Sequence, residues 1–312
     1  MTGGPLRVGL VGLGVISRFY IAALRTVPGM SLAAVCDRDP GVLAADRSGA
    51  PGYTDHVRML DEAGLDALAV TAPNDTHARI CADALDRGVA VCVEKPLALD
   101  LAQGEPLRVL ARDRDAVLFT AFHRRYNSEV ARLRGELAGR RVEEMTVRYL
   151  ERIEEHAGTD TWYLDPGRCG GGCVADNGPN AFDLVEFLLG PAEVVAARVD
   201  RDAAGTDRRA DVELRAGGAR VRVLLDWSHP GECKEVEVRT ADGAVLTADM
   251  LAGRPGFKES LWHEYEGVLT EFGRRVRGGR VDDAGGPSAL RLVGDTYRRA
   301  AVGGEQAREG VG

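Results

Sequence analysis

The sequence lacks any uninterrupted apolar run of the roughly 18 residues that a membrane-spanning helix requires. Its opening stretch, MTGGPLRVGLVGLG, also lacks a basic segment ahead of the apolar part, and glycines interrupt that part, so a signal peptide is not expected. The six cysteines, at 36, 81, 92, 169, 173 and 233, are scattered and indicate no disulfide framework. These absences together predict a cytoplasmic protein.

An excess of basic residues is also missing, because the net charge is −8 and the pI is about 5.4. Binding to a phosphate backbone needs a basic face, so nucleic acid is not expected as the main partner, although a local cluster could hold a small anion. In the CGGGC run, Cys169 and Cys173 lack the two further ligands that zinc would need. No metal is therefore expected.

The chain does have enough apolar residues, 45% of 312, for a sizeable core. In its first third, short apolar segments alternate with helical patterns. The expected strands are 6–11, 32–37, 67–73, 89–94 and 117–122, and the clearest helices are 17–27 and 76–88. Continuous apolar strands that alternate with helices indicate a parallel sheet covered on both faces, the doubly wound α/β pattern.

After about residue 125 the segments alternate polar and apolar residues instead, as half-buried antiparallel strands do. The expected strands are 142–150, 193–199, 210–214, 219–227, 234–240 and 243–249, with helices near 257–278 and 288–302. This predicts a doubly wound domain over 1–122, an α/β domain with a large open, mainly antiparallel sheet over 123–302, and a disordered tail over 303–312.

A glycine loop joins the first strand to the first helix. The segment VGLVGLGVISRF places Gly12, Gly14 and Ser17 in a G-x-G-x-x-G frame, with serine at the third position. Glycines there allow a tight turn and let backbone N–H groups approach a pyrophosphate. Asp37 ends the second strand, where a carboxylate binds the ribose hydroxyls of NAD and repels the 2′-phosphate of NADP. Arg38 leaves NADP open, unless it is a solvated loop arginine.

Two further loops leave the carboxyl edge of the sheet, where doubly wound folds bind their ligands. In TAPNDTH, 71–77, Pro73 and Asn74 are expected to line the cofactor cleft, and Thr76 to cap the next helix. In VEKPLAL, 93–99, Lys95 follows a buried strand, which favours a chemical role over that of an idle surface lysine. The sequence allows a cis peptide bond before Pro96.

A polar stripe is expected in the second domain, in the run DNGPNAFD. Asp176, Asn180 and Asp183 fall at i, i+4 and i+7. Pro179 suits the first turn of a helix, with Gly178 at its entry, and Gly190-Pro191 is expected to end it. The alternative is that Asp176 and its neighbour Asn177 only cap this helix.

These motifs occur in a fixed order along nearly the whole chain: Gly12-x-Gly14-x-x-Ser17, Asp37, APNDTH, EKP, HRRYN, a tryptophan, GGGCVADNGPNAFD and LLG. The sequence thereby resembles the glucose–fructose oxidoreductase, inositol dehydrogenase and rhizopine catabolism (Gfo/Idh/MocA) family. The resemblance implies a Rossmann domain, an open-sheet domain, and homodimers or homotetramers packed through that sheet. It implies hydride transfer between a nicotinamide and a sugar, cyclitol or related carbon, with further cofactor contacts from Val15, Ile16, Ala72, His77, Glu94, Lys95 and Pro96.

The sequence departs from that family at one position of its usual motif, D-x-G-x-H-x-x-D, because Asn180 stands where the catalytic histidine is expected. Asparagine does not titrate, so it cannot remove the hydroxyl proton during oxidation. Lys95 could take that proton while Asn180 orients the hydroxyl and Asp176 holds Lys95 or the sugar. Aldose 1-dehydrogenases of the family resemble this arrangement, and an anomeric hydroxyl is acidic enough for a weaker base.

Other residues are candidates for substrate binding. His123, in AFHRRYN, is a second candidate for the base, with a structural role as the alternative. Arg124 and Arg125 could bind a hydroxyl, carboxylate or phosphate, although one of them could face solvent. An aromatic ring before the glycine run could stack on a sugar, with a core or rim position as the alternative. The remaining candidates are Trp162, Tyr163, Arg168 and Asp183.

The sequence therefore predicts an NAD-dependent, or else NADP-dependent, oxidoreductase that acts on a sugar or cyclitol, with an aldose 1-dehydrogenase as the first hypothesis. A ketoreductase that acts on a nucleotide sugar or aminocyclitol is the alternative among enzymes. A catalytically inactive nucleotide-binding sensor is the alternative from another class. Retention of both Lys95 and Asp176 argues against the sensor, which needs neither.

Overall fold

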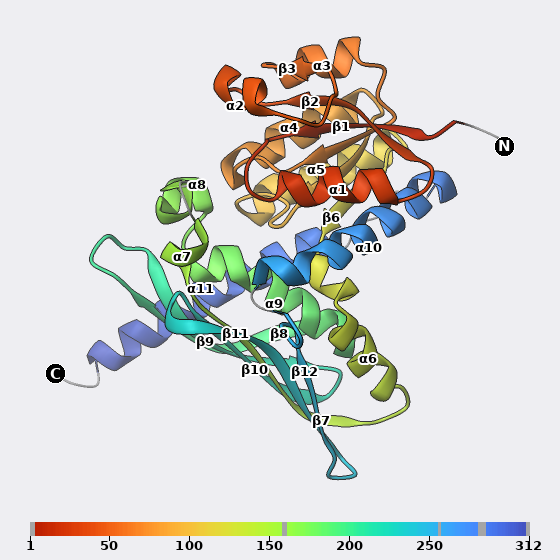
Figure 1. Ribbon diagram of the computed structural model, residues 1–312. Coiled ribbons are helices and arrows are strands. Elements are labelled where there is room, and N and C mark those ends of the chain that lie inside the picture. Colours follow the sequence, from red (N-terminus) through yellow and green to blue (C-terminus); the bar gives the residue numbers. More distant parts are fainter. Residues whose placement is uncertain (1–3, 158–160, 255–256, 280–284, 310–312) are drawn as a thin grey trace. The chain divides into compact units, whose positions relative to one another are not determined.

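The computed structural model describes residues 4–157, 161–254, 257–279 and 285–309 (Figure 1). The chain divides into two compact units. The first unit comprises residues 1–123 and 261–287, and the second comprises 124–260 and 288–312. The first boundary lies one residue from the position expected from the sequence, but the segment 261–287 groups with the first unit rather than the second.

The first unit contains a six-stranded parallel sheet in the order β3-β2-β1-β4-β5-β6. Strands β4 and β5 are buried along their whole length, which explains their unbroken apolar sequences. From β1, the strands β2 and β3 are added on one side and β4, β5 and β6 on the other, as in a Rossmann fold. The predicted doubly wound class is therefore confirmed. The strands are β1 (Leu6–Val11), β2 (Met30–Cys36), β3 (Gly52–Tyr53), β4 (Ala67–Val70), β5 (Ala90–Glu94) and β6 (Leu118–Ala121).

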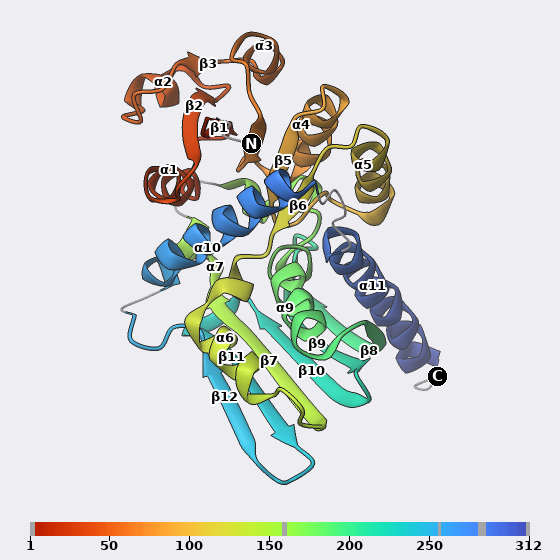
Figure 2. The ribbon, with the colours of Figure 1, turned by 90° about the vertical axis from the view of Figure 1, so that its right-hand side faces the viewer.

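Helices cover both faces of this sheet, with α1 on one side and α4 and α5 on the other (Figure 2). The two helices expected from periodicity, α1 and α4, are present. The short α2 and α3 carry weaker patterns and begin at aspartate N-caps, Asp39 and Asp55. The helices are α1 (Ser17–Thr26), α2 (Pro40–Ala45), α3 (His56–Glu62), α4 (Asn74–Asp86) and α5 (Leu101–Asp113).

Helix α10 (Phe257–Gly278) explains why the first unit includes a late segment of the chain. Its Trp262 and Tyr265 rings pack on Phe19 of α1, with centroids 4.4 and 5.7 Å away, and Phe272 packs on Phe119 of β6. The sequence assigned this helix to the second domain because it follows that domain's strands. Its apolar partners lie elsewhere, and they decide where it belongs.

The second unit contains a six-stranded mixed sheet in the order β12-β11-β7-β10-β9-β8. All neighbouring pairs are antiparallel except β7 with β10, so the expected open, mainly antiparallel sheet is confirmed. The strands are β7 (Val142–Arg152), β8 (Ala192–Arg201), β9 (Asp207–Ala216), β10 (Ala219–Asp226), β11 (Ser228–Thr240) and β12 (Val245–Asp249).

Helices cover one face of this sheet (Figure 2). In β10, Val221, Val223 and Leu225 face them and are buried, while Arg220 and Arg222 point to the other face, as the alternation predicts. The helical elements of this part of the chain are the short turns His123–Tyr126 and Thr161–Leu164, α6 (Ser128–Glu136), α7 (Ile153–Ala157), α8 (Pro166–Cys169), α9 (Cys173–Leu189) and α11 (Gly285–Glu309).

The C-terminal helix differs from the sequence expectation. Helix α11 continues to Glu309, through most of the segment for which disorder is predicted, and residues 310–312 lie outside the described residues. Among the helices that the structure describes, none is both long and apolar enough to cross a membrane.

Candidate active site

The glycine loop of the first unit is shaped by a close approach of two backbones. Gly12 has φ +91°, and a Cβ added there would lie 2.6 Å from the backbone nitrogen of Ala72, so only glycine fits. The half-buried Asp37 directly follows β2, and its Oδ2 accepts a hydrogen bond from the Leu13 N–H (2.9 Å). The carboxylate thus stands beside the loop that would cradle a pyrophosphate, while Arg38 is exposed.

The start of α1 follows this loop. Its N-cap position, Ile16, supplies no side-chain cap, and Ser17 instead donates its hydroxyl to the Gly14 carbonyl (2.7 Å). Most helices have a serine, threonine, aspartate or asparagine at the N-cap, whose side chain accepts from N–H groups of the first turn. The N-cap position of α1 provides no such side chain. Together with the glycine at position 12 and the carboxylate at the end of β2, this arrangement fits a dinucleotide.

The loops after β4 and β5 are tied together by His77, which is fully buried. Its Nε2 lies 2.8 Å from the Ala72 carbonyl oxygen and its Nδ1 lies 2.7 Å from that of Pro96. Burial lowers the pKa of the imidazole. Any role toward a cofactor would thus be indirect. The peptide bond between Lys95 and Pro96 is cis.

Helix α4 begins earlier than the sequence suggests. Its N-cap position is Pro73, so Asn74 lies in the first turn, where it is buried. Thr76 does not cap the helix, because its hydroxyl donates back to the Pro73 carbonyl (2.7 Å). The predicted cap is wrong because the fixed φ of proline starts the helical turn three residues sooner.

Glu94 ends β5 and Lys95 follows it, and the two side chains differ in burial. Glu94 is buried, and its Oε1 accepts a hydrogen bond from the Tyr20 hydroxyl (2.7 Å). Burial raises the pKa of this carboxyl to about 7, and hydrogen bonds from Tyr20 and Tyr265 and the charge of Lys95 oppose the rise. Lys95 itself is half-buried. The sequence identified these two residues but not the tyrosines around them.

His123 is already engaged within the first unit. Its Nδ1 pairs with the carboxylate of Glu264 on α10, and its ring stacks on Tyr265 with centroids 5.4 Å apart. The imidazole and Glu264 are both buried. This environment favours the structural role over that of a catalytic base, although its part in catalysis stays a prediction.

The two arginines that follow differ in exposure. Arg124 is fully buried in the second unit, and its guanidinium donates to the Tyr149 hydroxyl (3.0 Å) and to Ser260 (3.1 Å). Arg125 is partly exposed and forms a two-pronged ion pair with the buried Asp183 of α9. Three predicted substrate ligands are therefore bonded to other protein groups.

Helix α9 begins at Cys173, so Gly178 and Pro179 lie inside the helix rather than at its entry. The predicted start is wrong because a distant carboxylate caps the helix. Asp207, at the start of β9, accepts a hydrogen bond from the Val174 N–H (2.8 Å). A Cβ on Gly172 would lie 2.1 Å from the Asp207 carbonyl oxygen, which accounts for a glycine there. Asp176 and Asn177 thus lie inside the helix rather than at its N-cap, which is Gly172.

The polar stripe of α9 is present and buried: Asp176, Asn177, Asn180 and Asp183 are each 2–5% exposed. At the other end of the helix, Gly190 ends it with φ +88°, as predicted. Asn177 donates its Nδ2 hydrogen to Glu151 (2.7 Å), which in turn pairs with Lys234. The sequence analysis missed both charged partners. The sequence pattern could have revealed them, because each is a charged residue at a position that the alternation assigns to the buried side of its strand. Glu151 is on the same side as Tyr149, and Lys234 is on the same side as Val236.

The remaining candidates lie just before the glycine run. Trp162 and Tyr163 stack on one another with centroids 3.8 Å apart, and both are half-buried, as is Arg168. Cys169 and Cys173 are buried and are not in a disulfide. Among the described residues, no group of three or more histidine, cysteine, aspartate or glutamate side chains could hold a metal ion.

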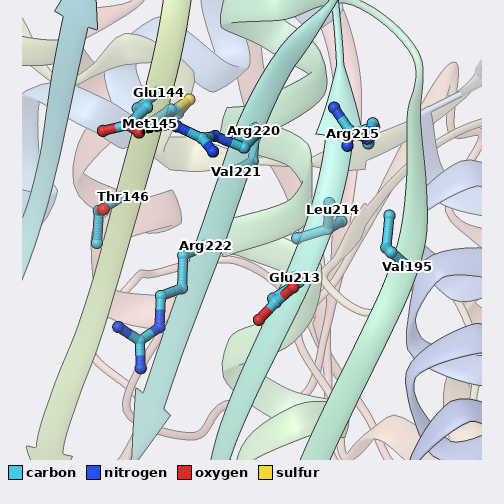
Figure 3. Close-up of a pocket in the computed structure, with 10 residues that line it drawn as sticks. All are labelled: Glu144, Met145, Thr146, Val195, Glu213, Leu214, Arg215, Arg220, Val221 and Arg222. Atoms are coloured by element: carbon cyan, nitrogen blue, oxygen red, sulfur yellow. Dashed lines mark hydrogen bonds and ion pairs between the residues drawn. The ribbon is translucent and has the colours of Figure 1, made fainter.

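A pocket of about 340 Å³ lies on the second unit's sheet and includes none of the predicted site residues (Figure 3). Ion pairs cross this surface, between Arg220 and Glu144 and between Arg222 and Asp211. Exposed pairs of this kind are typical of the open face of a sheet, so the pocket belongs to that face rather than to the candidate active site. Its lining comprises Glu144, Met145, Thr146, Val195, Glu213, Leu214, Arg215, Arg220, Val221 and Arg222.

Both units match models of one protein family. Residues 6–122 match the oxidoreductase family model with an NAD-binding Rossmann fold. Residues 138–246 match the GFO/IDH/MocA C-terminal domain. Together the two matches extend over most of the chain and follow the order of its domains.

Curated relatives and solved structures agree. The chain is 28% identical to D-xylose 1-dehydrogenase (NADP(+)) 2 of Haloferax volcanii, covering 95% of this chain and 97% of that one. It is 29% identical to inositol 2-dehydrogenase 2 of Paenarthrobacter aurescens, covering 79% and 68%. GenD2 from gentamicin A biosynthesis, crystallised with NAD, has a TM-score of 0.86 at 25% identity, covering 97% and 96%. The chain belongs to the GFO/IDH/MocA family of NAD-binding oxidoreductases.

Proposed function

We propose that this protein is an NAD(P)-dependent dehydrogenase that oxidises a free aldose at its anomeric carbon. The observation that carries the proposal is the position of Lys95, half-buried at the carboxyl end of a central strand of a dinucleotide-binding sheet. That edge of such a sheet is where ligands bind. One relative that matches nearly end to end is a D-xylose 1-dehydrogenase, which supports an aldose as the substrate class.

The bound nicotinamide supplies the hydride acceptor or donor, and the chain supplies binding and proton transfer. Gly12, Gly14, Val15 and Ile16 would hold the pyrophosphate, with Asp37 at the ribose. The other residues of the proposed cofactor set are Ser17, Arg38, Ala72, Pro73, Asn74, His77, Glu94, Lys95 and Pro96.

Lys95 takes the proton of the anomeric hydroxyl when its amine is neutral. Asn180 donates a hydrogen bond that orients this hydroxyl, and Asp176 accepts one from another sugar hydroxyl. Asparagine in place of a titrating histidine suits an anomeric hydroxyl, which is more acidic than an ordinary secondary alcohol. The other proposed substrate contacts come from His123, Arg124, Arg125, Trp162, Tyr163, Arg168 and Asp183.

A second function has support from one comparison. GenD2, which belongs to gentamicin A biosynthesis, shares the fold over almost the whole chain. This favours, as the alternative, a ketoreductase that acts on an aminocyclitol or nucleotide sugar. Both functions use the same fold and cofactor, and they differ in the substrate, in the carbon that reacts and in the direction of hydride transfer.

The test is the absorbance of reduced nicotinamide with purified protein and a panel of aldoses, cyclitols and nucleotide sugars, in both directions. We expect turnover on a free aldose, with the lactone as product. Turnover confined to a nucleotide sugar or cyclitol would replace the aldose proposal with the alternative. Tight cofactor binding without turnover on any compound would favour the inactive sensor instead.

Cofactor choice can be tested at Asp37. Its carboxylate repels a 2′-phosphate, so we expect Asp37→Ser to raise the KM for NAD and lower that for NADP, with a change in the NAD/NADP ratio of kcat/KM of about 10- to 100-fold. Steady-state kinetics with both cofactors measures this ratio. Asp39→Ser, at the exposed N-cap of α2, is the matched control. An unchanged ratio would rule out Asp37 as the discriminating group.

Two further properties stay predictions from the sequence. We expect a homodimer or homotetramer, which native mass spectrometry of the purified protein would establish. We also expect the enzyme in the cytoplasm, which cell fractionation would check.

A further inference from the structure

Lys234 of β11 is a lysine on the buried side of a sheet. The chain contains only three lysines among its 40 lysine and arginine residues, so arginine supplies nearly all of its positive charge. Even so, Lys234 shares the inward side of β11 with Val236 and Val238 and is only 2% exposed. A buried ammonium is costly unless it is paired and hydrogen-bonded. Its burial therefore requires partners that compensate the charge.

Glu151 of β7 is the partner of this lysine, and it is itself 4% exposed. One carboxylate oxygen accepts from the Lys234 ammonium, and the other accepts from the Asn177 amide (2.7 Å). The ammonium also lies 3.7 Å from a Glu232 oxygen and 5.3 Å from the centroid of the Tyr149 ring. A single carboxylate, held from both sides, thus joins two strands of the sheet to α9.

The link reaches α9 at the turn that carries the proposed substrate ligands. Asn177 directly follows Asp176 and precedes Asn180 by three residues. Side chains three residues apart are neighbours on a helix surface, so a fixed Asn177 side chain limits how this turn can rotate or shift. All of these residues belong to the second unit.

We propose that Lys234 is a positioning residue for the reaction: acting through Glu151 and Asn177, it holds the α9 turn in the orientation in which Asp176 and Asn180 bind substrate hydroxyls. The inference rests on the proposed function of that turn. Apolar residues of similar size often stabilise a core as well as a buried ion pair does. Charge-assisted hydrogen bonds add a fixed direction, which apolar contacts do not provide.

The experiment compares Asn177→Ala, Lys234→Met and their double variant with the wild type, using the substrate that the wild type turns over. We expect each single variant to lower kcat/KM for the sugar about 10- to 100-fold, because a small displacement of reacting groups is costly. Affinity for NADH, measured by fluorescence titration, should not change. The double variant should be no worse than the poorer single variant, since both interrupt one chain of contacts.

Two matched variants separate positioning from general stability. Adding Glu151→Gln to Lys234→Met removes the stranded charge yet keeps an acceptor for Asn177, so activity should recover toward the wild type. Arg298→Met breaks an ion pair with Asp295 on α11, away from the sheet, and should leave the kinetics unchanged. A merely structural network would instead lower the thermal midpoint of Lys234→Met while Asn177→Ala keeps full kcat/KM, and this result would overturn the proposal.

A wild type that turns over no sugar would reject the proposed function but would leave the positioning role of Lys234 open. Hydrogen exchange tests that role without any turnover. The readout is the peptide that covers 173–189, compared by mass spectrometry. We expect faster exchange there in Asn177→Ala and Lys234→Met than in Arg298→Met. Equal exchange in all three variants would show that the network does not hold this turn.

Discussion

Replacing Lys95 with alanine should lower kcat by about 10³-fold, within the range that a positioned proton-transfer group contributes. The reason is that Asn180 cannot titrate, so in the proposed mechanism no second group of the motif replaces the lost amine. Binding of NADH should persist, because the glycine loop and Asp37 belong to other loops of the first unit. Steady-state kinetics and a fluorescence titration of NADH together measure the two effects.

Lys95→Arg distinguishes proton transfer from orientation at this position. Arginine keeps the charge and can donate hydrogen bonds, but it does not lose its proton in proteins, so we expect it to be nearly as inactive as alanine. Lys258→Ala, which removes a half-buried lysine from the start of α10, should behave as the wild type. If Lys95→Ala keeps more than a tenth of the activity, the base lies elsewhere, and His123→Asn becomes the next variant.

Glu94→Gln should change how stability depends on pH. The ordinary glutamate pKa of 4.5 rises to about 7 in the folded protein, chiefly through burial. Below pH 4.5 the carboxyl is protonated in both states and has no effect on stability. Between pH 4.5 and 7 the folded state keeps a proton that the unfolded state has lost, so rising pH costs the wild type about 3 kcal/mol of unfolding free energy. The variant, which does not titrate, escapes this loss.

Urea unfolding of both proteins at pH 5 and pH 8 tests this, with the pH effect in the wild type minus that in Glu94→Gln as the readout. The glutamine amide would still offer an oxygen to the Tyr20 hydroxyl, so the core hydrogen bond is retained. Glu105→Gln is the matched control, because the pKa shift there has the opposite sign: a hydrogen bond from Arg108 lowers the pKa of that exposed carboxyl. Its effect should be small, since solvent screens the pair. Equal pH dependence in the wild type and Glu94→Gln would mean that Glu94 is not buried as a neutral acid.

The first unit could be predicted closely from the sequence because its signals are local. Buried parallel strands read as unbroken apolar runs, and the turn at Gly12 needs a residue without a side chain. Asp37 and Lys95 were identifiable because each directly follows such a strand, at the edge where ligands bind. In the second unit, alternation of polar and apolar residues predicted the strands for the same reason, since burial on one face leaves a period of two.

The start of α9 could not be predicted in this way. Pro179 and Gly178 look like the beginning of a helix, yet the helix begins at Cys173, because Asp207 caps it from 33 residues farther along the chain. The same limit applied to α10, which follows the second sheet in sequence but packs its aromatic rings on Phe19 and Phe119. In both cases, the deciding partner is distant in sequence.

The sequence by itself determined the Rossmann domain, the open sheet and the dinucleotide loop, because each of these follows from a pattern within short segments. Only the tertiary structure decided which partner each charged group meets: Asp183 pairs with Arg125, His123 with Glu264, and Glu151 with Lys234 and the Asn177 amide. The sequence around a charged residue does not indicate which residue will be its partner. Burial removes it from water, and the partner that then compensates the charge is set by the way the strands and helices pack.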